Sequence, residues 1–290
     1  MNSVKKEHVE ILRSIGKIVL SIIAVNIITL ISCILGSIIY QNVNITNFPD
    51  MFSDTMNSNL GYALCTIITA IFVYLFYKCL IKKEKLSFED LGFVKEHKIS
   101  QVLKGFLLGV IFVLIYIGFL IAMKEVTFEY RPLDINIVYS LFMGLIIFTV
   151  VAFTEEITYR GYIQFILSKK NKYIGIIITA ILFALSHLIN SGYSLLSLIY
   201  LTIGGIMFGM MRLQKKNIWF PLGFHVAYNW TEIRIFGLNN ETTNHWFLTN
   251  ITQNTIWNGG ESGTGIIIVL VELVFISIFL YLNRKRIVNQ

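Results

Sequence analysis

The sequence predicts an all-α polytopic membrane protein with about eight transmembrane helices. The composition is too apolar for an ordinary soluble domain, since 55% of the 290 residues are hydrophobic and 14% are charged, with a mean hydropathy of +0.68. Separate apolar segments follow one another along the chain, and Lys and Arg gather in every second connection between them. We therefore treat residues 1–290 as a single membrane domain in contact with membrane lipids.

Eight apolar segments are long enough, or nearly long enough, to cross a bilayer as helices. They are residues 15–40, 60–81, 102–123, 136–168, 173–190, 194–211, 218–236 and 264–283. The first follows several basic residues, as a signal peptide does, but it lacks a convincing small-residue cleavage site and is expected to be retained. The fifth and seventh are the weakest predictions because they are short or polar.

The distribution of basic residues predicts the orientation of the chain. Lys and Arg cluster before the first segment, after the second, fourth and sixth, and after the eighth, whereas residues 237–263 contain none. Basic residues favour the cytoplasmic side, so both termini are expected in the cytoplasm and the loop 237–263 outside. The same rule explains the net charge of +7 without a nucleic-acid partner. The Ile-, Asn- and Lys-rich composition suggests the plasma membrane of an AT-rich bacterium.

Three further expectations concern single segments and residues. The main cytoplasmic loop, residues 82–98, is expected to include a short helix at the membrane surface. Cys33, Cys65 and Cys79 have no CxxC spacing, so reduced thiols are expected. Glu272 in the last apolar segment is expected to form an ion pair with Arg234.

The segment 150–170 contains two acids and an arginine in an otherwise apolar sequence. Each such charge costs about 2.5 kcal/mol or more at the centre of a membrane helix. In a helix Glu156 and Arg160 lie four residues apart on one face and can neutralise each other. Glu155 points about 100° away from Glu156 and has no local partner, which makes it the first candidate for chemistry.

His187, His225 and Asn229 are polar residues within later apolar segments. At 1.5 Å per helical residue, Glu155 and His187 both lie roughly 20 Å from the cytoplasmic lysines, so they can face each other. His225 is shallower unless its helix tilts or begins late, and Asn229 lies one turn further along the same face. Each residue alone is typical of an interhelical hydrogen bond, but together they suggest a hydrolytic site with a general base and oxyanion donors.

Three signatures of intramembrane proteases are missing from the sequence. It contains no HExxH motif, no pair of aspartates deep in the apolar segments, and no serine in a GxSG motif. The motifs that remain are EExxxR at 155–160, FxxxH at 183–187 and HxxxN at 225–229.

These three motifs, in this order, resemble the CPBP family of CAAX-prenyl and bacteriocin-processing (Abi) endopeptidases. The resemblance covers about residues 150–235 and implies a glutamate-dependent intramembrane protease with a polar cavity open to the cytoplasm. It assigns water activation to Glu155 with His187, and oxyanion binding to His225 and Asn229. Glu156 and Arg160 become a supporting ion pair.

The resemblance leaves cofactor, substrate and role open. Zinc bound by Glu155, His187 and His225 is one alternative, but Asn229 is a poor zinc ligand and favours a site without metal. The implied substrate is a peptide or lipidated peptide, prenylated or bearing a leader, cleaved near the cytoplasmic side. A non-catalytic immunity or partner-binding protein is the second hypothesis, and a transporter the third.

Overall fold

The structure is a computed structural model that describes residues 2–41, 48–189, 195–238, 244–252, 254–259 and 265–288. It is nearly all helical, as predicted. The α-helices are α1 (Asn2–Gln41), α2 (Phe48–Asn57), α3 (Asn59–Lys83), α4 (Lys98–Ala122), α5 (Ile135–Glu155), α6 (Gln164–Ser168), α7 (Lys172–Ser186), α8 (Leu195–Lys215), α9 (Trp219–Asn229) and α10 (Ile266–Val288). The other elements are the π-helices η2 (Glu156–Ile163) and η4 (Trp230–Ile235), the 3-10 helix η3 (His187–Ile189), and the strands β1 (Val126–Tyr130) and β2 (Phe247–Ile251).

Each of the eight predicted apolar segments is helical over most of its described residues. The exceptions lie at segment ends and are Met123, Ile218, Phe236 and Gly265. Five helical stretches within the described residues are long and apolar enough to cross a membrane: Glu7–Gln41, Asn59–Lys83, Lys98–Ala122, Ile135–Ser168 and Leu195–Lys215. Lys172–Ser186 and Ile266–Leu282 are shorter apolar helices. The structure is thus that of a polytopic membrane protein, while the count of eight spans stays a prediction.

Polar side chains fix where several helices begin. The Asp134 carboxylate accepts a hydrogen bond from the backbone N–H of Ile137 at the start of α5, 2.8 Å away. Asn171 caps α7 by accepting from the N–H groups of Tyr173 and Ile174. Such caps satisfy N–H groups that have no partner within the helix. They set the start of α5, which ends at Glu155, and the start of α7, which leads directly into His187.

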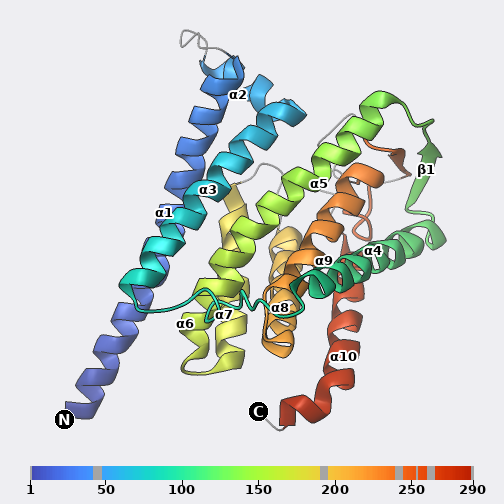
Figure 1. Cartoon of the computed structure of the whole chain (residues 1–290). Coiled ribbons are helices and arrows are strands. Elements are labelled where there is room, and N and C mark those ends of the chain that lie inside the picture. Colours follow the sequence, from blue (N-terminus) through green and yellow to red (C-terminus); the bar gives the residue numbers. More distant parts are fainter. Residues whose placement is uncertain are drawn as a thin grey trace.

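The helices pack side by side (Figure 1). Those that carry or lead into the EExxxR, FxxxH and HxxxN motifs, α5, α7 and α9, lie in the middle. α1 packs on α3, α3 on α5, α4 on α9, and α7 on α8. A second cluster of contacts joins α10 to α8. Residues 155–160, 187 and 225 therefore lie on neighbouring elements, and the N-terminal helices cover one side of them.

The predicted surface helix in residues 82–98 is wrong, because between Lys83 and Lys98 the chain forms turns. Gly92 has a φ of 95°, and Lys85 and His97 also have positive φ values, which a helix does not allow. The N–H and hydroxyl of Ser87 both donate to Asp90, which lowers the pKa of that carboxyl. A local turn has replaced the helical hydrogen bonds here.

At the end of the molecule away from the two termini, the connections contain elements that were not predicted from the sequence (Figure 1). α2 precedes α3, and β1 pairs antiparallel with β2, with Val126 opposite Ile251 and Tyr130 opposite Phe247. β-branched and aromatic residues favour these short strands. Part of the loop 237–263 lies outside the described residues, so its structure is given only for β2 and its neighbours.

The predicted ion pair between Glu272 and Arg234 is also wrong for these two described residues. Arg234 Nη1 donates to the Ser140 hydroxyl on α5, 3.2 Å away. Glu272 faces the backbone of α8, where a Cβ on Gly204 would lie 2.7 Å from its Oε1. The two side chains point to different neighbouring helices, which the sequence positions alone do not reveal.

Candidate active site

The two adjacent glutamates lie where the backbone changes from α-helix to π-helix. Glu155 ends α5, and Glu156 begins η2, all of whose residues are buried. The Glu155 side chain is 24% exposed, whereas that of Glu156 is 1% exposed. Short π-helical segments widen a helix locally and occur often at functional sites. The segment thus gives its two acids different surroundings, as the sequence predicted.

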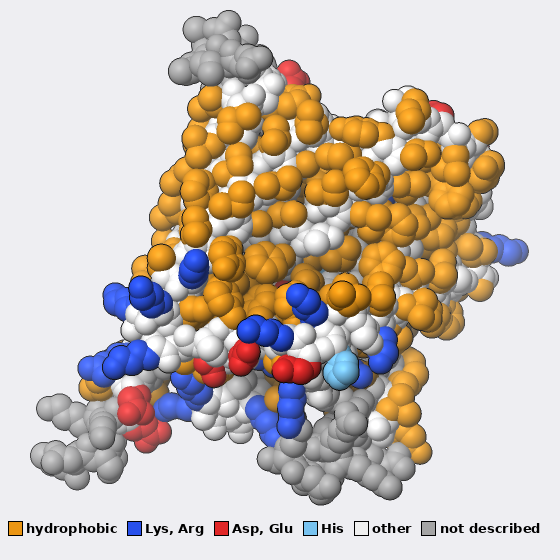
Figure 2. Space-filling view, in the orientation of Figure 1, with side chains coloured by type: hydrophobic (Ala, Val, Ile, Leu, Met, Phe, Trp, Pro, Cys, Tyr) orange, Lys and Arg blue, Asp and Glu red, His pale blue; other side chains and the backbone are white. Residues whose placement is uncertain are grey.

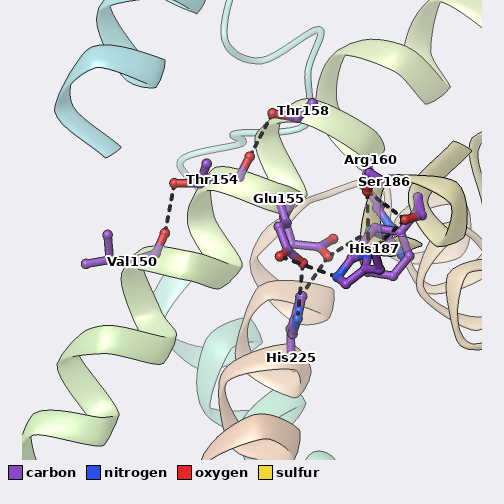
Figure 3. Close-up of polar contacts among 10 residues, drawn as sticks. Val150, Thr154, Glu155, Thr158, Arg160, Ser186, His187 and His225 are labelled. Atoms are coloured by element: carbon purple, nitrogen blue, oxygen red, sulfur yellow. Dashed lines mark hydrogen bonds and ion pairs between the residues drawn. The ribbon is translucent and has the colours of Figure 1, made fainter. Parts of the chain in front are cut away.

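Glu155 lies between two histidines from separate helical segments. Its Oε1 is 3.9 Å from His187 Nε2, and its Oε2 is 3.6 Å from His225 Nε2. Figure 3 shows the three side chains pointing toward one another. α9 begins only at Trp219, and this late start brings His225 level with Glu155. The structure therefore brings together the three residues that carry the predicted chemistry.

His187 is oriented by the backbone of its own helix. Its Nδ1 lies 2.8 Å from the carbonyl of Phe183, one turn earlier. Because a carbonyl can only accept, Nδ1 carries the hydrogen of this bond. Nε2 then points toward Glu155. The Phe183 ring also packs edge-on against the imidazole at 4.6 Å between centroids, which gives the FxxxH spacing a physical role.

His225 contacts both glutamates. Its Nδ1 lies 3.1 Å from Glu156 Oε1, and its Nε2 faces Glu155. Only 7% of the side chain is exposed. A buried imidazole between two carboxylates has its orientation fixed from both sides.

The predicted contact between Glu156 and Arg160 is present, at 3.4 Å between Oε1 and Nη1. The guanidinium is fully buried and lies over the rings of Phe183 and Phe208, 4.2 and 5.0 Å from their centroids. Aromatic faces attract cations, so the arginine is stabilised by both the carboxylate and the rings. Phe208, which comes from α8, is one of many phenylalanines in apolar helices and was not predicted to take part.

Asn229 is the last residue of α9, one turn beyond His225, and is half-buried. Its side-chain amide makes no hydrogen bond to the described part of the chain. An unpaired amide near the reacting groups can donate to a bound substrate.

A cavity of about 360 Å³ lies next to Glu155 and His187, which both line it. It lies between α1, α3, the α5–η2 junction and α7. Sequence reasoning did not select its hydroxyl-bearing residues. One signal was available, since Thr154 and Thr158 have helical spacing on either side of the glutamates. The polar lining is Asn26, Thr29, Tyr62, Thr66, Thr69, Thr154, Glu155, Thr158, Tyr159, Ser186 and His187.

The zinc alternative receives no support from the arrangement of ligands. Among the described residues, no group of three or more His, Cys, Asp or Glu side chains is placed to hold a metal ion. The second ring nitrogens of both histidines contact the carbonyl of Phe183 and the carboxylate of Glu156. Such contacts orient a histidine ring whether or not it binds a metal.

Comparison with known proteins agrees with the motifs. Residues 137–231 match the family model described as type II CAAX prenyl endopeptidase Rce1-like. No curated protein matches the chain. The matched region contains Glu155, His187, His225 and Asn229 together with the supporting pair Glu156 and Arg160. This part of the chain is therefore similar to the type II CAAX prenyl endopeptidases, which supports the resemblance that its three motifs carry.

Proposed function

We propose that the protein is a glutamate-dependent intramembrane endopeptidase that cleaves a peptide or membrane-associated substrate near the cytoplasmic side of a bacterial plasma membrane. The observation that carries this proposal is the position of Glu155, within 4 Å of ring nitrogens of both His187 and His225 and partly open to a cavity. The family match supports a protease. The role in peptide maturation or bacteriocin processing is part of the proposal.

In the proposed reaction, a water molecule lies between Glu155 and Nε2 of His187. Glu155 removes a proton from this water while the water oxygen attacks the carbonyl carbon of the scissile bond. The proton then passes from Glu155 to the leaving amine as the C–N bond breaks. The products are a carboxylic acid and an amine, and Glu155 is regenerated.

The position of His225 suits an oxyanion donor. Its Nδ1 lies 3.1 Å from Glu156 Oε1, and its Nε2 faces Glu155 beside the reacting centre. Together with the Asn229 amide it can donate to the oxyanion that forms on the attacked carbonyl.

The test is peptide hydrolysis by the purified protein in detergent, with a synthetic peptide library read by mass spectrometry. Replacing Glu155 or His187 with Ala should lower turnover by several orders of magnitude, because both act on the water. Cleavage that persists in Glu155→Ala would end the proposal. Elemental analysis of wild type and both His→Ala variants should show no stoichiometric zinc, whereas a full equivalent lost in both variants would establish a metal site.

A further inference from the structure

The cavity beside Glu155 and His187 has a lining of hydroxyl groups contributed by four helical segments. Six serine and threonine hydroxyls line it, and each donates its hydrogen to a backbone carbonyl of its own helix. These are Thr29 to Val25, Thr66 to Ala63, Thr69 to Cys65, Thr154 to Val150, Thr158 to Thr154, and Ser186 to Phe183. Figure 3 shows the bonds of Thr154 and Thr158.

A hydroxyl group has one hydrogen to donate and two lone pairs to accept with. The hydrogens of these six groups are engaged within the helices, so their oxygens can only accept. The hydroxyls of Thr158 and Ser186 also contact those of Tyr77 and Tyr159, which leaves Thr29, Thr66, Thr69 and Thr154 as the acceptors offered to the cavity. The amide nitrogen of Asn26 likewise donates to the carbonyl of Ile22. Apart from the tyrosine hydroxyls, the wall therefore favours a ligand that donates hydrogen bonds.

The charged residues of the wall also favour a ligand that donates hydrogen bonds, and in particular a cation. Glu155 contributes a carboxylate, and the Nδ1–H of His187 is directed at the carbonyl of Phe183. Among the described residues that line the cavity, none is Lys or Arg. Arg160 lies behind the wall with a fully buried side chain, where it contacts Glu156.

We propose that this cavity binds a cationic, N–H-bearing side chain of the substrate, that of Lys or Arg. The inference rests on the proposed peptidase function and names the chemistry of its substrate. An ammonium or guanidinium brings only donors and loses hydration in the membrane, so it requires acceptors and a counter-charge. The wall supplies both. A prenyl chain has no donor to offer, and it lies outside this cavity when such a substrate binds.

Cys33 lines the same cavity and provides a readout that does not need catalysis. A variant with Cys65→Ala and Cys79→Ala keeps Cys33 alone, and one with Cys33→Ala and Cys65→Ala keeps the exposed Cys79 as control. Both are treated with methanethiosulfonates carrying an ammonium, a trimethylammonium or a sulfonate. Cys33 should react about tenfold faster with the ammonium than with the sulfonate, after correction by the Cys79 rates, because the cavity concentrates cations.

Two substitutions separate charge from hydrogen bonding. Glu155→Gln should lower the rates of both cationic reagents at Cys33. The double variant Thr66→Val, Thr154→Val should lower the rate of the ammonium reagent and leave that of the trimethylammonium reagent unchanged, because only the ammonium has N–H groups. Thr149→Val is the matched control, because its hydroxyl also donates to a carbonyl one turn earlier but does not line the cavity. Equal corrected rates for all three reagents in the unsubstituted Cys33 protein would overturn the inference.

Peptides that differ only in one residue, lysine or norleucine, test the same inference in the reaction. The pair is scanned across the positions on both sides of the cleaved bond. At one position lysine should raise kcat/KM about tenfold over norleucine, and the two Thr→Val changes should reduce this ratio. Cleavage with no preference for lysine at any position would overturn the inference about the cavity but would still support the proposed protease function. If wild type cleaves none of the peptides, the proposed function fails, and the Cys33 rates still decide the character of the cavity.

Discussion

Glu155 and Glu156 are neighbours in the sequence, but their surroundings separate their roles. Glu155 is partly open to the cavity and faces two imidazoles, whereas Glu156 is closed off between His225 and Arg160. An acid that activates water needs access to it. An acid that holds an arginine and a histidine in a membrane interior needs burial and good contacts.

Replacing Glu156 should therefore damage the fold, and replacing Glu155 should not. Glu156→Gln leaves the buried guanidinium of Arg160 without its counter-ion and weakens the contact with His225. Breaking a buried pair in this way costs about 3 kcal/mol or more. The yield of folded protein and the melting temperature in detergent should fall for Glu156→Gln and stay near wild type for Glu155→Gln. Equal destabilisation of the two variants would remove the division between chemistry and structure.

Asn229 should act only on the transition state. Its amide is not engaged by the described part of the chain, and it lies one turn beyond His225. Asn229→Ala should lower kcat by roughly 10² to 10³, the usual effect of removing one oxyanion donor. KM should change little, because the donor meets a charge that forms during the reaction. A rise in KM with unchanged kcat would instead assign Asn229 to substrate binding.

At the residue scale, the sequence predicted the site because charged groups in apolar segments are costly and therefore conspicuous. Glu155, Glu156, Arg160, His187 and His225 all meet in one place. Their roles are still predictions. The partners that orient them could not be predicted, because the carbonyl of Phe183 and the ring of Phe208 are ordinary features of apolar helices.

At the scale of the elements, helix positions followed from hydropathy, whereas the contacts between helices did not. α9 carries His225 and Asn229, and it packs on α4 at glycine contacts. A Cβ on Gly105 would lie 2.1 Å from the carbonyl oxygen of Phe220, and one on Gly109 would lie 2.6 Å from that of Phe224. Small residues let two membrane helices approach closely. The turns at 84–97 and the π-helix η2 depend on such local geometry, which a hydropathy pattern does not contain.

Gly105→Ala should test this contact. The added methyl group meets backbone rather than a side chain, so α4 and α9 must separate, at a cost of roughly 1–3 kcal/mol. Gly118→Ala on the same helix is the control, because its Cβ would have no atom within 4 Å. Thermal melting in detergent should show a lower melting temperature for Gly105→Ala only. A similar drop in both variants would attribute the effect to α4 itself and not to its contact with α9.

At the scale of the whole molecule, the surface has an apolar band with a basic end. Figure 2 shows Lys and Arg side chains gathered below a broad hydrophobic surface. Figure 1 places the start of α1 and the end of α10 at this same end, with α2 and β1 toward the other. The basic clusters that the structure describes thus meet on one side of the folded chain, although they are separate in the sequence. A linear charge pattern predicts this only if the helices cross the membrane in turn.

The orientation in the membrane gives the last prediction. Basic residues favour the cytoplasmic side, so the basic end should face the cytoplasm and β2 the outside. In a variant without the native cysteines, Asn250→Cys on β2 and Lys170→Cys before α7 place one exposed thiol at each end. A membrane-impermeant maleimide added to intact cells should label Cys at 250 and should label Cys at 170 only after permeabilisation. The reverse pattern would place the basic end outside and remove the cytoplasmic access that the proposed protease requires, whereas labelling of both sites in intact cells would show that the two ends do not lie on opposite sides of the membrane.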